Sequence, residues 1–446
     1  MARLRVDATS PVDWLYTAEG GANLVLSYAG DAVPDLQRHA LRLRKRKRIA
    51  GPQGAIPDQV DVEFGDKVVR PLLGPELCLE AQVVALSSEW LRSVAGSLAA
   101  RNVRPLKRVE EDDVDVAAGK GVLVEDLISG RGCLSVEIKP KWGFLPSRDH
   151  LSPETADVKS AYCRTCMHRA LKRAPRITTA KRVGAEPALA VDREEFCPLD
   201  LYSRDPARTS RALQQLYASW TSSDGGINNL RFFLDGKLVK PSELPPQFEE
   251  KMTSSSEFDG DPASGFASRF TPILLASPVL PRLAALQASL DPLDIEGLAA
   301  RVRDELGLDL YRPDLAEDEV ASTLGGQPTT QEWQAWLERA SAPAPPNEQD
   351  APLRDLVLAY LLSATFKDCS IFIRVDSPPF PANIATTLSA DDPSAIAGAE
   401  IKVIDLDPKP IARMGKYARM DREIVEHWRD SVLAGGAPSR CCGTTA

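Results

Sequence analysis

The sequence predicts an α+β protein with a β-rich N-terminal lobe and a larger, mostly helical C-terminal lobe that contains a few short strands. Short alternating or β-branched runs, separated by Gly, Pro and Asp, gather in the first third of the 446 residues. Apolar residues spaced three and four apart dominate the remainder. Hydrophobic residues make up 43% of the chain and charged residues 26%, as in a folded globular protein with a large core.

Four short runs predict the strands of the N-terminal part. Each is bounded by residues that favour turns, the pattern of a strand that ends in a loop. Between them, the segment 75–102 has the apolar spacing and the length of a helix. We therefore expect a small sheet with one helix, assigned to an N-terminal lobe over residues 1–128. The predicted strands are 22–30, 39–45, 121–127 and 133–139.

The C-terminal lobe is expected to span residues 129–435, with a disordered tail over 436–446. Two apolar runs near its end predict embedded strands at 370–375 and 401–406. The segments near 250–266 and 338–352 are rich in Pro, Ser, Gly and acidic residues, so we expect flexible surface insertions there. Helical spacing predicts helices at 161–173, 210–220, 280–306 and 421–434.

The charge of the chain is acidic overall but locally basic. The formal net charge is −9, yet six of the seven residues in RLRKRKR (42–48) are basic. Such a run is typical of nuclear localisation or nucleic-acid contact, so a nuclear nucleic-acid-binding or scaffold protein is the alternative function. That alternative predicts a basic domain with interleaved aromatic residues, whereas aromatic residues make up only 6% of this acidic chain. Nucleic acid is therefore not the expected partner.

Composition also bears on cellular location. The residues after Met1 contain no apolar region of a secretory signal, and the apolar run 356–362 is far shorter than the ~20 residues that span a bilayer. Eight cysteines are too sparse for a disulfide framework. We expect an intracellular monomer in the nucleus, the cytoplasm or both, with no membrane partner.

One pair of cysteines has metal-ligand spacing. Cys163 and Cys166 form a CxxC motif, and a structural zinc site needs two more ligands, for which His168 and Cys197 are the nearest candidates. No second CxxC or HxxxH pair follows. Zinc is thus one interpretation of the motif, and two buried thiols at the start of a helix is the other.

The stretch GCLSVEIKPKWGFLP (132–146) carries charges at every second position. In a strand, alternate side chains point to opposite faces, so Glu137, Lys139 and Lys141 would share the face opposite the apolar residues. One carboxylate and two ammonium groups on one wall can hold a nucleotide and phosphates. A solvated strand face is the alternative.

A glycine turn precedes the first long strand. Gly20 and Gly21 allow a backbone to approach phosphates closely, and Arg42 and Arg44 lie on the following strand, pointing away from its leucines. A glycine-rich hairpin followed by a strand-borne cation is the arrangement by which kinases hold ATP phosphates. A plain hairpin is the alternative.

Carboxylates flank the two late strands. Asp368 precedes the run 370–375, while Asp405 and Asp407 follow the other run. A carboxylate at a strand end near phosphates can ligate magnesium, which prefers oxygen ligands. In protein kinases a catalytic Asp and a metal-binding Asp bracket such elements. Taken singly, each of these residues also suits a turn or a helix cap.

The residues that follow DLDP place two cations and a phenol four apart. Lys409, Arg413 and Tyr417 would form one stripe of a helix in which Pro410 occupies the first turn. The amides of that helix start would face an anion beside Asp405. An exposed stripe on an amphipathic helix is the alternative.

Together these motifs resemble the inositol-pentakisphosphate 2-kinase family. The resemblance runs in the family's order from residue 13 to about residue 425, and the pairing of GGANL with EIKPKxGF is its specific part. This sequence departs from the family pattern at Trp142, where a small residue or Cys is common, and in its insertions. The other matching pieces are CRTCMHRALK, CPLDLYS, NNLRFFLDG, LDIEG, KDCSI and IDLDPKP.

The resemblance implies a two-lobed inositol polyphosphate kinase fold, distantly similar to protein kinases, and dependence on ATP and Mg²⁺. The implied reaction moves the γ-phosphoryl group of ATP to the 2-hydroxyl of inositol 1,3,4,5,6-pentakisphosphate, which gives inositol hexakisphosphate (phytic acid). Arg42 would replace the protein-kinase strand lysine, Glu125 would lie near adenine, and Glu137 would contact the ribose. The residues implied for the nucleotide and its phosphates are Gly20, Gly21, Asn23, Arg42, Glu125, Glu137 and Asp405.

The resemblance also assigns the catalytic and inositide-binding residues. Asp405 would be the magnesium ligand, and Asp368 would be the base that accepts the proton of the 2-hydroxyl. The implied contacts to the inositide phosphates are Arg104, Lys139, Lys141, Lys172, Asn228, Arg231, Lys409, Arg413 and Tyr417.

Overall fold

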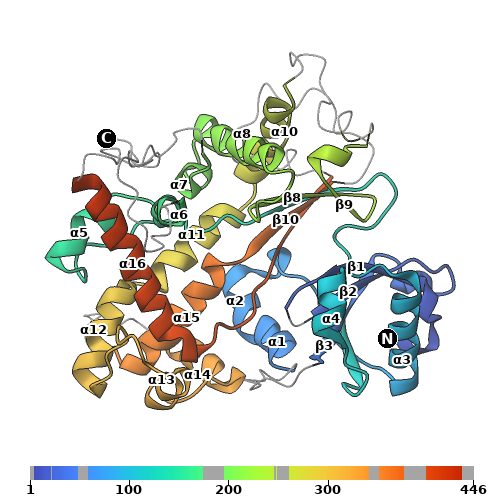
Figure 1. The fold of residues 1–446 in the computed structure, drawn as a ribbon, viewed down its shortest axis with the longest axis horizontal. Helices are drawn as coiled ribbons and strands as arrows, with labels where there is room; N and C mark the ends of the chain where they lie inside the picture. Colours follow the sequence, from blue (N-terminus) through green and yellow to red (C-terminus); the bar gives the residue numbers. More distant parts are fainter. Residues whose placement is uncertain are drawn as a thin grey trace, which may run out of the picture.

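The computed structural model describes most of the chain, in segments that carry both sheets and the helices around them (Figure 1). The predicted tail over 436–446 lies outside the described residues, as do 251–260 and 341–350, which hold most of the two expected insertions. The described residues are 5–21, 23–48, 59–173, 195–245, 248, 261–340, 351–375 and 398–433.

The N-terminal sheet contains six strands in the order β1-β2-β3-β6-β4, with β5 paired to β3. All of its pairings are antiparallel. The three strands predicted within 1–128 are confirmed as β2, β3 and β6. The strands are β1 (Trp14–Glu19), β2 (Asn23–Tyr28), β3 (His39–Lys47), β4 (Ala81–Ala85), β5 (Asp112–Val114) and β6 (Lys120–Glu125).

The expectation of one helix over 75–102 is wrong. A short 3₁₀ turn at Pro75–Leu77 leads into strand β4, and only Ser88–Arg101 is helical, as α3. The run that contains Val83 and Val84 also suits a strand, and pairing with β6 stabilises it in that form. Ser87 begins the helix because its side chain accepts the backbone N–H of Trp90. The helix α3 covers the sheet through a shared apolar core.

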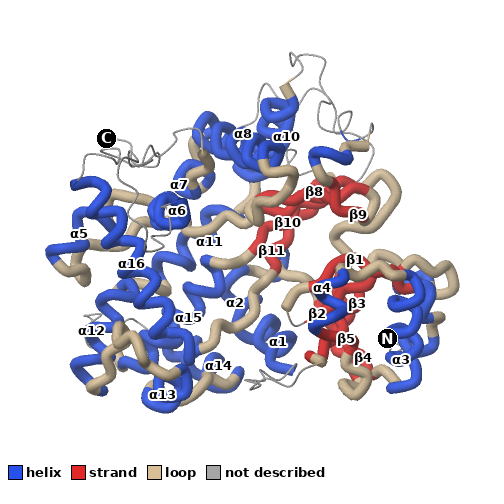
Figure 2. The backbone as a smooth tube through the Cα atoms, in the orientation of Figure 1, coloured by secondary structure: helices blue, strands red, loops and turns tan. Residues whose placement is uncertain are grey.

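The second sheet contains five antiparallel strands in the order β11-β10-β7-β8-β9. Figure 2 shows it apart from the N-terminal sheet and bordered by helices. The strands predicted at 133–139 and 370–375 are confirmed, but 133–139 was expected with the N-terminal strands and instead pairs with β8 and β10. The last strand lies two residues earlier than the expected 401–406. The strands are β7 (Leu134–Ile138), β8 (Leu230–Leu234), β9 (Lys237–Val239), β10 (Ser370–Val375) and β11 (Ala399–Ile404).

Helices form most of the C-terminal part. The segment expected as one helix over 280–306 is two helices, because the turn that contains Asp291 and Pro292 separates α11 from α12. The PASG segment at 262–265 is not a loop, since Asp261 caps a helix that begins there. The larger helices are α5 (Pro153–Lys159), α6 (Arg164–Arg173), α8 (Pro206–Ser222), α10 (Pro262–Ala276), α11 (Val279–Ser289), α12 (Asp294–Leu306), α15 (Leu353–Lys367) and α16 (Met414–Leu433).

The remaining helices are short or lie at the edge of the core. An unpredicted segment, α1 (Gln59–Phe64) followed by a π-helical turn (Gly65–Val69) and α2 (Arg70–Leu73), packs into the C-terminal core through Phe64 and Leu73. The others are α4 (Leu106–Glu111), α7 (Pro198–Leu201), α13 (Glu317–Thr323) and α14 (Thr330–Ala340). Among the described helices, no single one is long and apolar enough to cross a membrane; one bent pair, α10 with the stretch Val279–Leu306, passes on length and composition alone.

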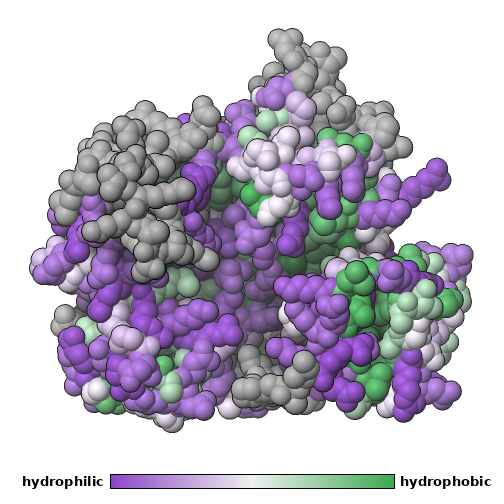
Figure 3. All heavy atoms as spheres, viewed as in Figure 1, coloured by the Kyte–Doolittle hydropathy of each residue, from purple (hydrophilic) through white to green (hydrophobic). Residues whose placement is uncertain are grey.

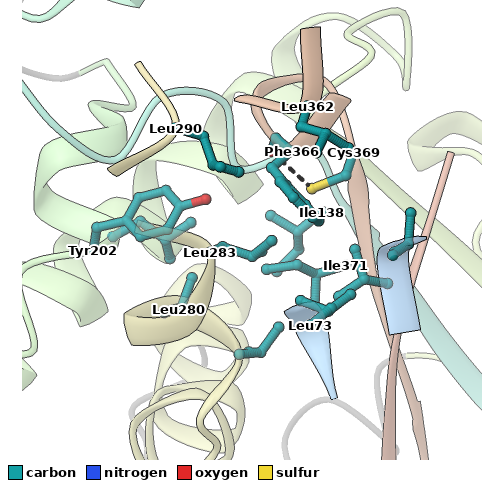
Figure 4. Packing of buried hydrophobic residues seen from close by; sticks show 14 of the residues in the cluster. Leu73, Ile138, Tyr202, Leu280, Leu283, Leu290, Leu362, Phe366, Cys369 and Ile371 are labelled. Carbon is teal, nitrogen blue, oxygen red and sulfur yellow. Dashed lines mark hydrogen bonds between the residues drawn. The ribbon is translucent and has the colours of Figure 1, made fainter. Parts of the chain in front are cut away.

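The helix α15 is the centre of the C-terminal core. Nearly every residue from Leu356 to Lys367 is buried, so the helix is apolar all round rather than amphipathic. Figure 4 shows Leu362 and Phe366 from this helix packed with Ile138 of β7 and Ile371 of β10. The chain passes from this helix directly into β10, and the buried helix thereby fixes where that strand begins.

A buried ion cluster joins three helices of the C-terminal part. The Lys159 ammonium of α5 contacts Asp294 of α12 and lies 2.6 Å from Asp421 Oδ2 of α16. All three side chains are almost inaccessible to water, and Arg164 adds a second contact to Asp421 at 2.9 Å. A buried cation with two carboxylates is stable only while its partners remain, because each charge lacks water.

Replacing Lys159 with Met leaves two carboxylates buried together. We expect a loss of about 3–5 kcal/mol in the free energy of unfolding at pH 8. Burial already raises the pKa of Asp294 to about 6, and losing the ammonium raises it further. A carboxyl whose folded pKa exceeds its unfolded value binds its proton more tightly in the fold, so the deficit should shrink as pH falls toward 5.5.

Denaturant unfolding of the Lys159→Met variant at both pH values measures this deficit. The control is Arg303→Met, which removes an exposed ion pair with Asp304 and should change stability by about 0.5 kcal/mol or less. A deficit that is independent of pH, or no larger than that of the control, would show that the cluster does not depend on its buried charge balance.

Candidate active site

The pairing register of the second sheet brings four sequence segments to one edge. Strand β7 ends at Ile138, which pairs with Leu230 at the start of β8 and with Ile371 near the start of β10. On the far side of β10, Ser370 pairs with Ile404 at the end of β11. Antiparallel strands alternate in direction, so the end of β7 meets the beginnings of its neighbours. The charged residues that flank these strands therefore meet at this edge.

Glu137 is held inside this edge by a hydroxyl and two cations. Its side chain is buried and accepts a hydrogen bond of 2.8 Å from Ser370 Oγ. The Arg231 guanidinium lies 3.4 Å from Glu137 Oε2, because the two residues face each other across β7 and β8. Lys139 Nζ is 3.9 Å from the other oxygen. A buried carboxylate with such partners can accept hydroxyl donors from a ligand.

Asp405 follows directly after β11 and contacts two of the residues that surround Glu137, namely Lys139 and Ser370. Oδ2 of Asp405 accepts a hydrogen bond of 2.8 Å from Lys139 Nζ and lies 3.1 Å from Ser370 Oγ, whose one proton can go to either Glu137 or Asp405. The carboxylate is half exposed. Ser370 thus bridges Glu137 and Asp405. An exposed carboxylate at a strand end, with further oxygen atoms nearby, provides the hard ligands that Mg²⁺ prefers.

Asp368 lies between two other lysines, immediately before β10. Lys409 Nζ donates to its Oδ2 at 2.8 Å, and Lys141 Nζ is 3.5 Å from its Oδ1. The structure therefore brings together five of the residues that the sequence singled out. These are Lys139, Lys141, Asp368, Asp405 and Lys409.

The charges of this edge change one another's ionisation. Partial removal from water favours the protonated form of Asp368, but Lys409 and Lys141 outweigh this effect and lower its pKa. Burial acts to lower the pKa of Lys139, yet Asp405 and Glu137 together raise it. Asp368 consequently stays an ionised acceptor, while Lys139 stays charged.

Two residues of this edge adopt left-handed backbone conformations. The φ angles are +63° at Lys141 and +60° at Asp405. Residues with a Cβ rarely adopt this region, so the surrounding contacts have to hold them there. Figure 3 shows that this face of the molecule is hollowed near its centre and that hydrophilic side chains line the hollow.

The N-terminal sheet carries a second candidate pocket. Asn23 and Arg42, which the family resemblance assigns to the nucleotide, both line it, because they lie on the paired strands β2 and β3. Arg44 and Lys120 add two further cations. The pocket is lined by Asn23, Arg42, Arg44, Val83, Lys120, Gly121 and Val122.

The glycine turn and the end of β6 border this region. The Gly20 amide donates to the Asn23 carbonyl, which closes the turn, and a Cβ at Gly20 or Gly21 would meet no atom within 4 Å. The backbone there is open toward a ligand, but no steric need for glycine is evident. Glu125 ends β6, and Lys402 Nζ lies 3.3 Å from its Oε2, so this carboxylate contacts β11 of the other sheet.

Two further residues predicted to contact the inositide, Lys172 and Asn228, have different surroundings in the structure. Lys172 of α6 acts electrostatically on Lys141, and burial, followed by Lys172 and Arg164, lowers the pKa of His168 to about 4. Asn228 is exposed, whereas its neighbour Asn229 donates to the Lys139 carbonyl at 3.1 Å.

The expected helical stripe of Lys409, Arg413 and Tyr417 is wrong in its first two members, because only Tyr417 lies on α16. Pro410 precedes a 3₁₀ turn that ends at Arg413, and α16 begins at Met414. Lys409 is therefore outside the helix and reaches Asp368 from the preceding loop. Tyr417 does lie on α16, where burial raises its pKa and Arg413 acts on it electrostatically.

Arg104, another residue predicted to contact the inositide, forms ion pairs within the N-terminal sheet. It is buried, with its guanidinium 2.7 Å from Glu19 and 2.6 Å from Asp112. Lys45 of the basic run 42–48 contacts the same two carboxylates. The run forms part of strand β3 rather than a free peptide. In this structure Arg104 therefore pairs with carboxylates of the N-terminal sheet.

The CxxC motif gathers a third thiol. The sulfur atoms of Cys163, Cys166 and Cys197 lie within 4.8 Å of one another, and all three residues are buried. Among the described residues, His168 does not belong to this group. Three thiols at this spacing can hold a zinc ion that takes a fourth ligand.

The sequence analysis missed three residues of the candidate site. Ser370 stands inside the KDCSI motif, so the motif itself was a usable signal, but its bridging role depends on two distant carboxylates. Asn229 and Lys120 gave no local signal beyond their polarity.

Comparison with known proteins gives a consistent match. A family model described as inositol-pentakisphosphate 2-kinase matches residues 16–423. Proteins of that name from Cryptococcus neoformans, Arabidopsis thaliana and Danio rerio are 33%, 28% and 24% identical to this chain. The alignments cover 95%, 93% and 97% of this chain and 95%, 93% and 96% of the respective relatives.

Replacing Lys409 with Met should raise the pKa of the Asp368 carboxyl, because the nearest positive charge is lost. Carbon-detected NMR titration of the carboxyl groups, with the signal assigned by its absence in Asp368→Asn, measures the change. Lys416→Met removes an exposed lysine of α16 and serves as the control. An unchanged or lower pKa in Lys409→Met would contradict the pairing.

Proposed function

This chain belongs to the inositol-pentakisphosphate 2-kinase family, and we propose that it transfers the γ-phosphoryl group of ATP to the 2-hydroxyl of inositol 1,3,4,5,6-pentakisphosphate. The product is inositol hexakisphosphate. The observation that carries this proposal is the meeting of Asp368, Asp405 and three lysines at one sheet edge. Phosphoryl transfer requires positioned carboxylates, a metal ion and cations that neutralise phosphate charge.

Asp368 is proposed as the base that accepts the proton of the attacking 2-hydroxyl. Its position at the sheet edge, beside the lysines proposed to bind phosphate, supports this role, and its lowered pKa keeps the carboxylate ionised while those lysines remain paired with it. Lys141 and Lys409 hold Asp368 before substrate arrives. When inositide phosphates compete for these ammonium groups, the carboxylate is released toward the hydroxyl.

Asp405 is proposed as the magnesium ligand. Its half-exposed carboxylate and the nearby oxygen of Ser370 fit a hard cation. When bound, Mg²⁺ neutralises the charge of the transferred phosphoryl group. Lys139 contacts Asp405 in this structure and would turn to an anionic phosphate.

The nucleotide is proposed to lie between the two sheets. Arg42 from the N-terminal pocket meets its phosphates, Glu137 accepts from the ribose, and Glu125 lies near adenine. Gly20, Gly21 and Asn23 complete the phosphate turn. The remaining inositide contacts are proposed to be Lys172, Asn228, Arg231, Arg413 and Tyr417, with Arg104 included only if its ion pairs open.

The architecture is proposed to be two-lobed and distantly protein-kinase-like, with the lobes at 1–128 and 129–435. We also propose that the protein works as an intracellular monomer. The burial of Lys45 and the strand structure of 42–47 weigh against the nucleic-acid alternative, because most of the run is paired in the sheet.

Incubation with ATP, Mg²⁺ and inositol pentakisphosphate tests the function, with positional analysis of the product. Asp368→Asn should lower turnover about a hundredfold or more, the usual scale of a lost general base. Asp405→Asn should chiefly weaken the use of Mg-ATP. The control is Asp304→Asn, which changes an exposed carboxylate that is not one of the site residues. Phosphorylation at another hydroxyl, or full turnover in either site variant, would contradict the assignment.

We also propose zinc at the thiol group of Cys163, Cys166 and Cys197. Metal analysis of the purified protein should give about one zinc per chain. Cys197→Ser should lose zinc and stability, whereas Cys133→Ser, at a buried thiol outside the group, should keep the metal. Metal-free protein with unchanged stability would favour the alternative of buried thiols.

A further inference from the structure

The left-handed backbone at Lys141 needs an outside support. The residue follows Pro140 beyond the end of β7, and its φ of +63° is unfavourable for a side chain of this size. Such a conformation persists only where the surroundings over-determine it. Its ammonium group lies beside Asp368, so the turn sets where that charge points.

Gln287 supplies this support from the helix α11. The side chain is completely buried. Its Oε1 accepts the Gly143 amide at 2.7 Å, and its Nε2 donates to the Lys141 carbonyl at 3.1 Å. One amide group therefore holds both sides of the turn, with its acceptor on one peptide and its donor on another.

The same Nε2 reaches the helix that carries Asp368. It donates to the Phe366 carbonyl at 2.9 Å, in the last turn of α15. Carbonyls in the last turn of a helix have no partner within that helix, so a side-chain donor is valuable there. Asp368 is the residue directly after this helix. Gln287 thus links the backbone of the Lys141 turn to the backbone that sets the position of Asp368.

Tyr202 closes the remaining side of the turn. Its hydroxyl lies 3.4 Å from the Lys141 carbonyl and 3.3 Å from Gln287 Nε2. A Cβ at Gly143 would come within 2.6 Å of the Tyr202 ring, so only glycine fits against it. Figure 4 shows Tyr202 among the apolar side chains of α11 and α15, including Leu283 and Phe366. The turn therefore rests on a packed wall rather than on solvent.

We propose that Gln287 is a positioning residue for phosphoryl transfer, which fixes Lys141 for a substrate phosphate and Asp368 for the attacking hydroxyl without touching either ligand. This inference rests on the proposed function of Lys141 and Asp368. It adds a residue that lies outside the sequence motifs and acts only through backbone carbonyls and one backbone amide.

Gln287→Met keeps the length and most of the volume of the side chain but removes its donor and its acceptor. Misplacing the Lys141 charge should raise KM for the inositide about tenfold, and misplacing Asp368 should lower kcat about tenfold, the scale of one or two lost hydrogen bonds to positioned groups. KM for ATP should stay within about twofold, because no contact of Gln287 leads to the N-terminal pocket.

Ser363→Ala is the matched control. Its hydroxyl is buried and donates to the main-chain carbonyl of Gln287 at 2.7 Å, so its loss weakens the same contact between helices. It has no bond to the turn. Thermal unfolding should show destabilisation in this variant, with both kinetic constants unchanged. Equal kinetics in Gln287→Met and Ser363→Ala would overturn the proposal.

A second comparison tests whether Gln287 acts through Lys141. In the Lys141→Met background the inositide KM is already raised, and adding Gln287→Met should raise it little further. A rise by the same factor in both backgrounds would overturn the proposed route. If wild-type protein fails to phosphorylate inositol pentakisphosphate, the proposed function fails. If wild-type protein is active but Lys141→Met leaves the inositide KM unchanged, the function stands and this inference about Gln287 and Lys141 is overturned.

Gln287→Glu covers the case in which the Met variant does not fold. The carboxylate has the same shape and still accepts from Gly143, but it cannot donate to the two carbonyls. Its kcat should be low at neutral pH and should recover in part, relative to wild type, as pH falls and protonation restores one donor. A constant ratio to wild type across pH would contradict the role of the donor.

Discussion

The antiparallel register of β7 between β8 and β10 is the constraint on which the candidate site depends. Backbone hydrogen bonds fix Ile138 opposite Leu230 and Ile371. This register sets the positions of the charged residues that flank the three strands. A shift by one residue would turn Glu137 to the other face of the sheet. Both faces of the strand are buried, so this shift would place the Glu137 carboxylate on the face that now holds Val136 and Ile138. The core therefore enforces the register that the chemistry requires.

Charge balance is the second property of this edge. Three lysines and two aspartates pair with one another, so the site is nearly neutral within itself. Each pair is partly exposed, and such pairs are weak enough to exchange partners when phosphate arrives. The ion cluster of Lys159 behind the site is different, because it is buried and its partners have no replacement. Exchangeable pairs face the ligand, while fixed pairs hold the helices together.

The buried helix α15 connects these two regions. Its last residue, Lys367, is buried, contacts Asp291 at 2.5 Å and lies 4.1 Å from the centre of the Trp142 ring. Arg164 lies 4.5 Å from the same ring, so the indole receives two cations. Trp142 follows Lys141 and packs the turn that carries it against the helix that precedes Asp368.

Local sequence patterns predicted some of the observed strands and helices correctly and others wrongly. Alternation predicted the strand at 133–139, since each side chain's face follows from its position in an extended chain, and an apolar run predicted the strand at 370–375. The same logic failed over 75–102, where apolar spacing suited a helix but pairing with β6 made part of the segment a strand. The helical spacing of Lys409 was also misleading, because a 3₁₀ turn precedes α16 and leaves Lys409 outside the helix.

By itself the sequence determined the α+β class, most of the strands, and the residue types of the site through motifs such as EIKPK and KDCSI. Only the tertiary structure decided which of these residues meet. It paired Lys139 with Asp405, enclosed Arg104 between Glu19 and Asp112, and set Gln287 beneath Lys141. The physical reason is separation along the chain: a strand's faces are set by adjacent residues, whereas these contacts join residues up to 266 positions apart and exist only once the sheet and its helices have packed.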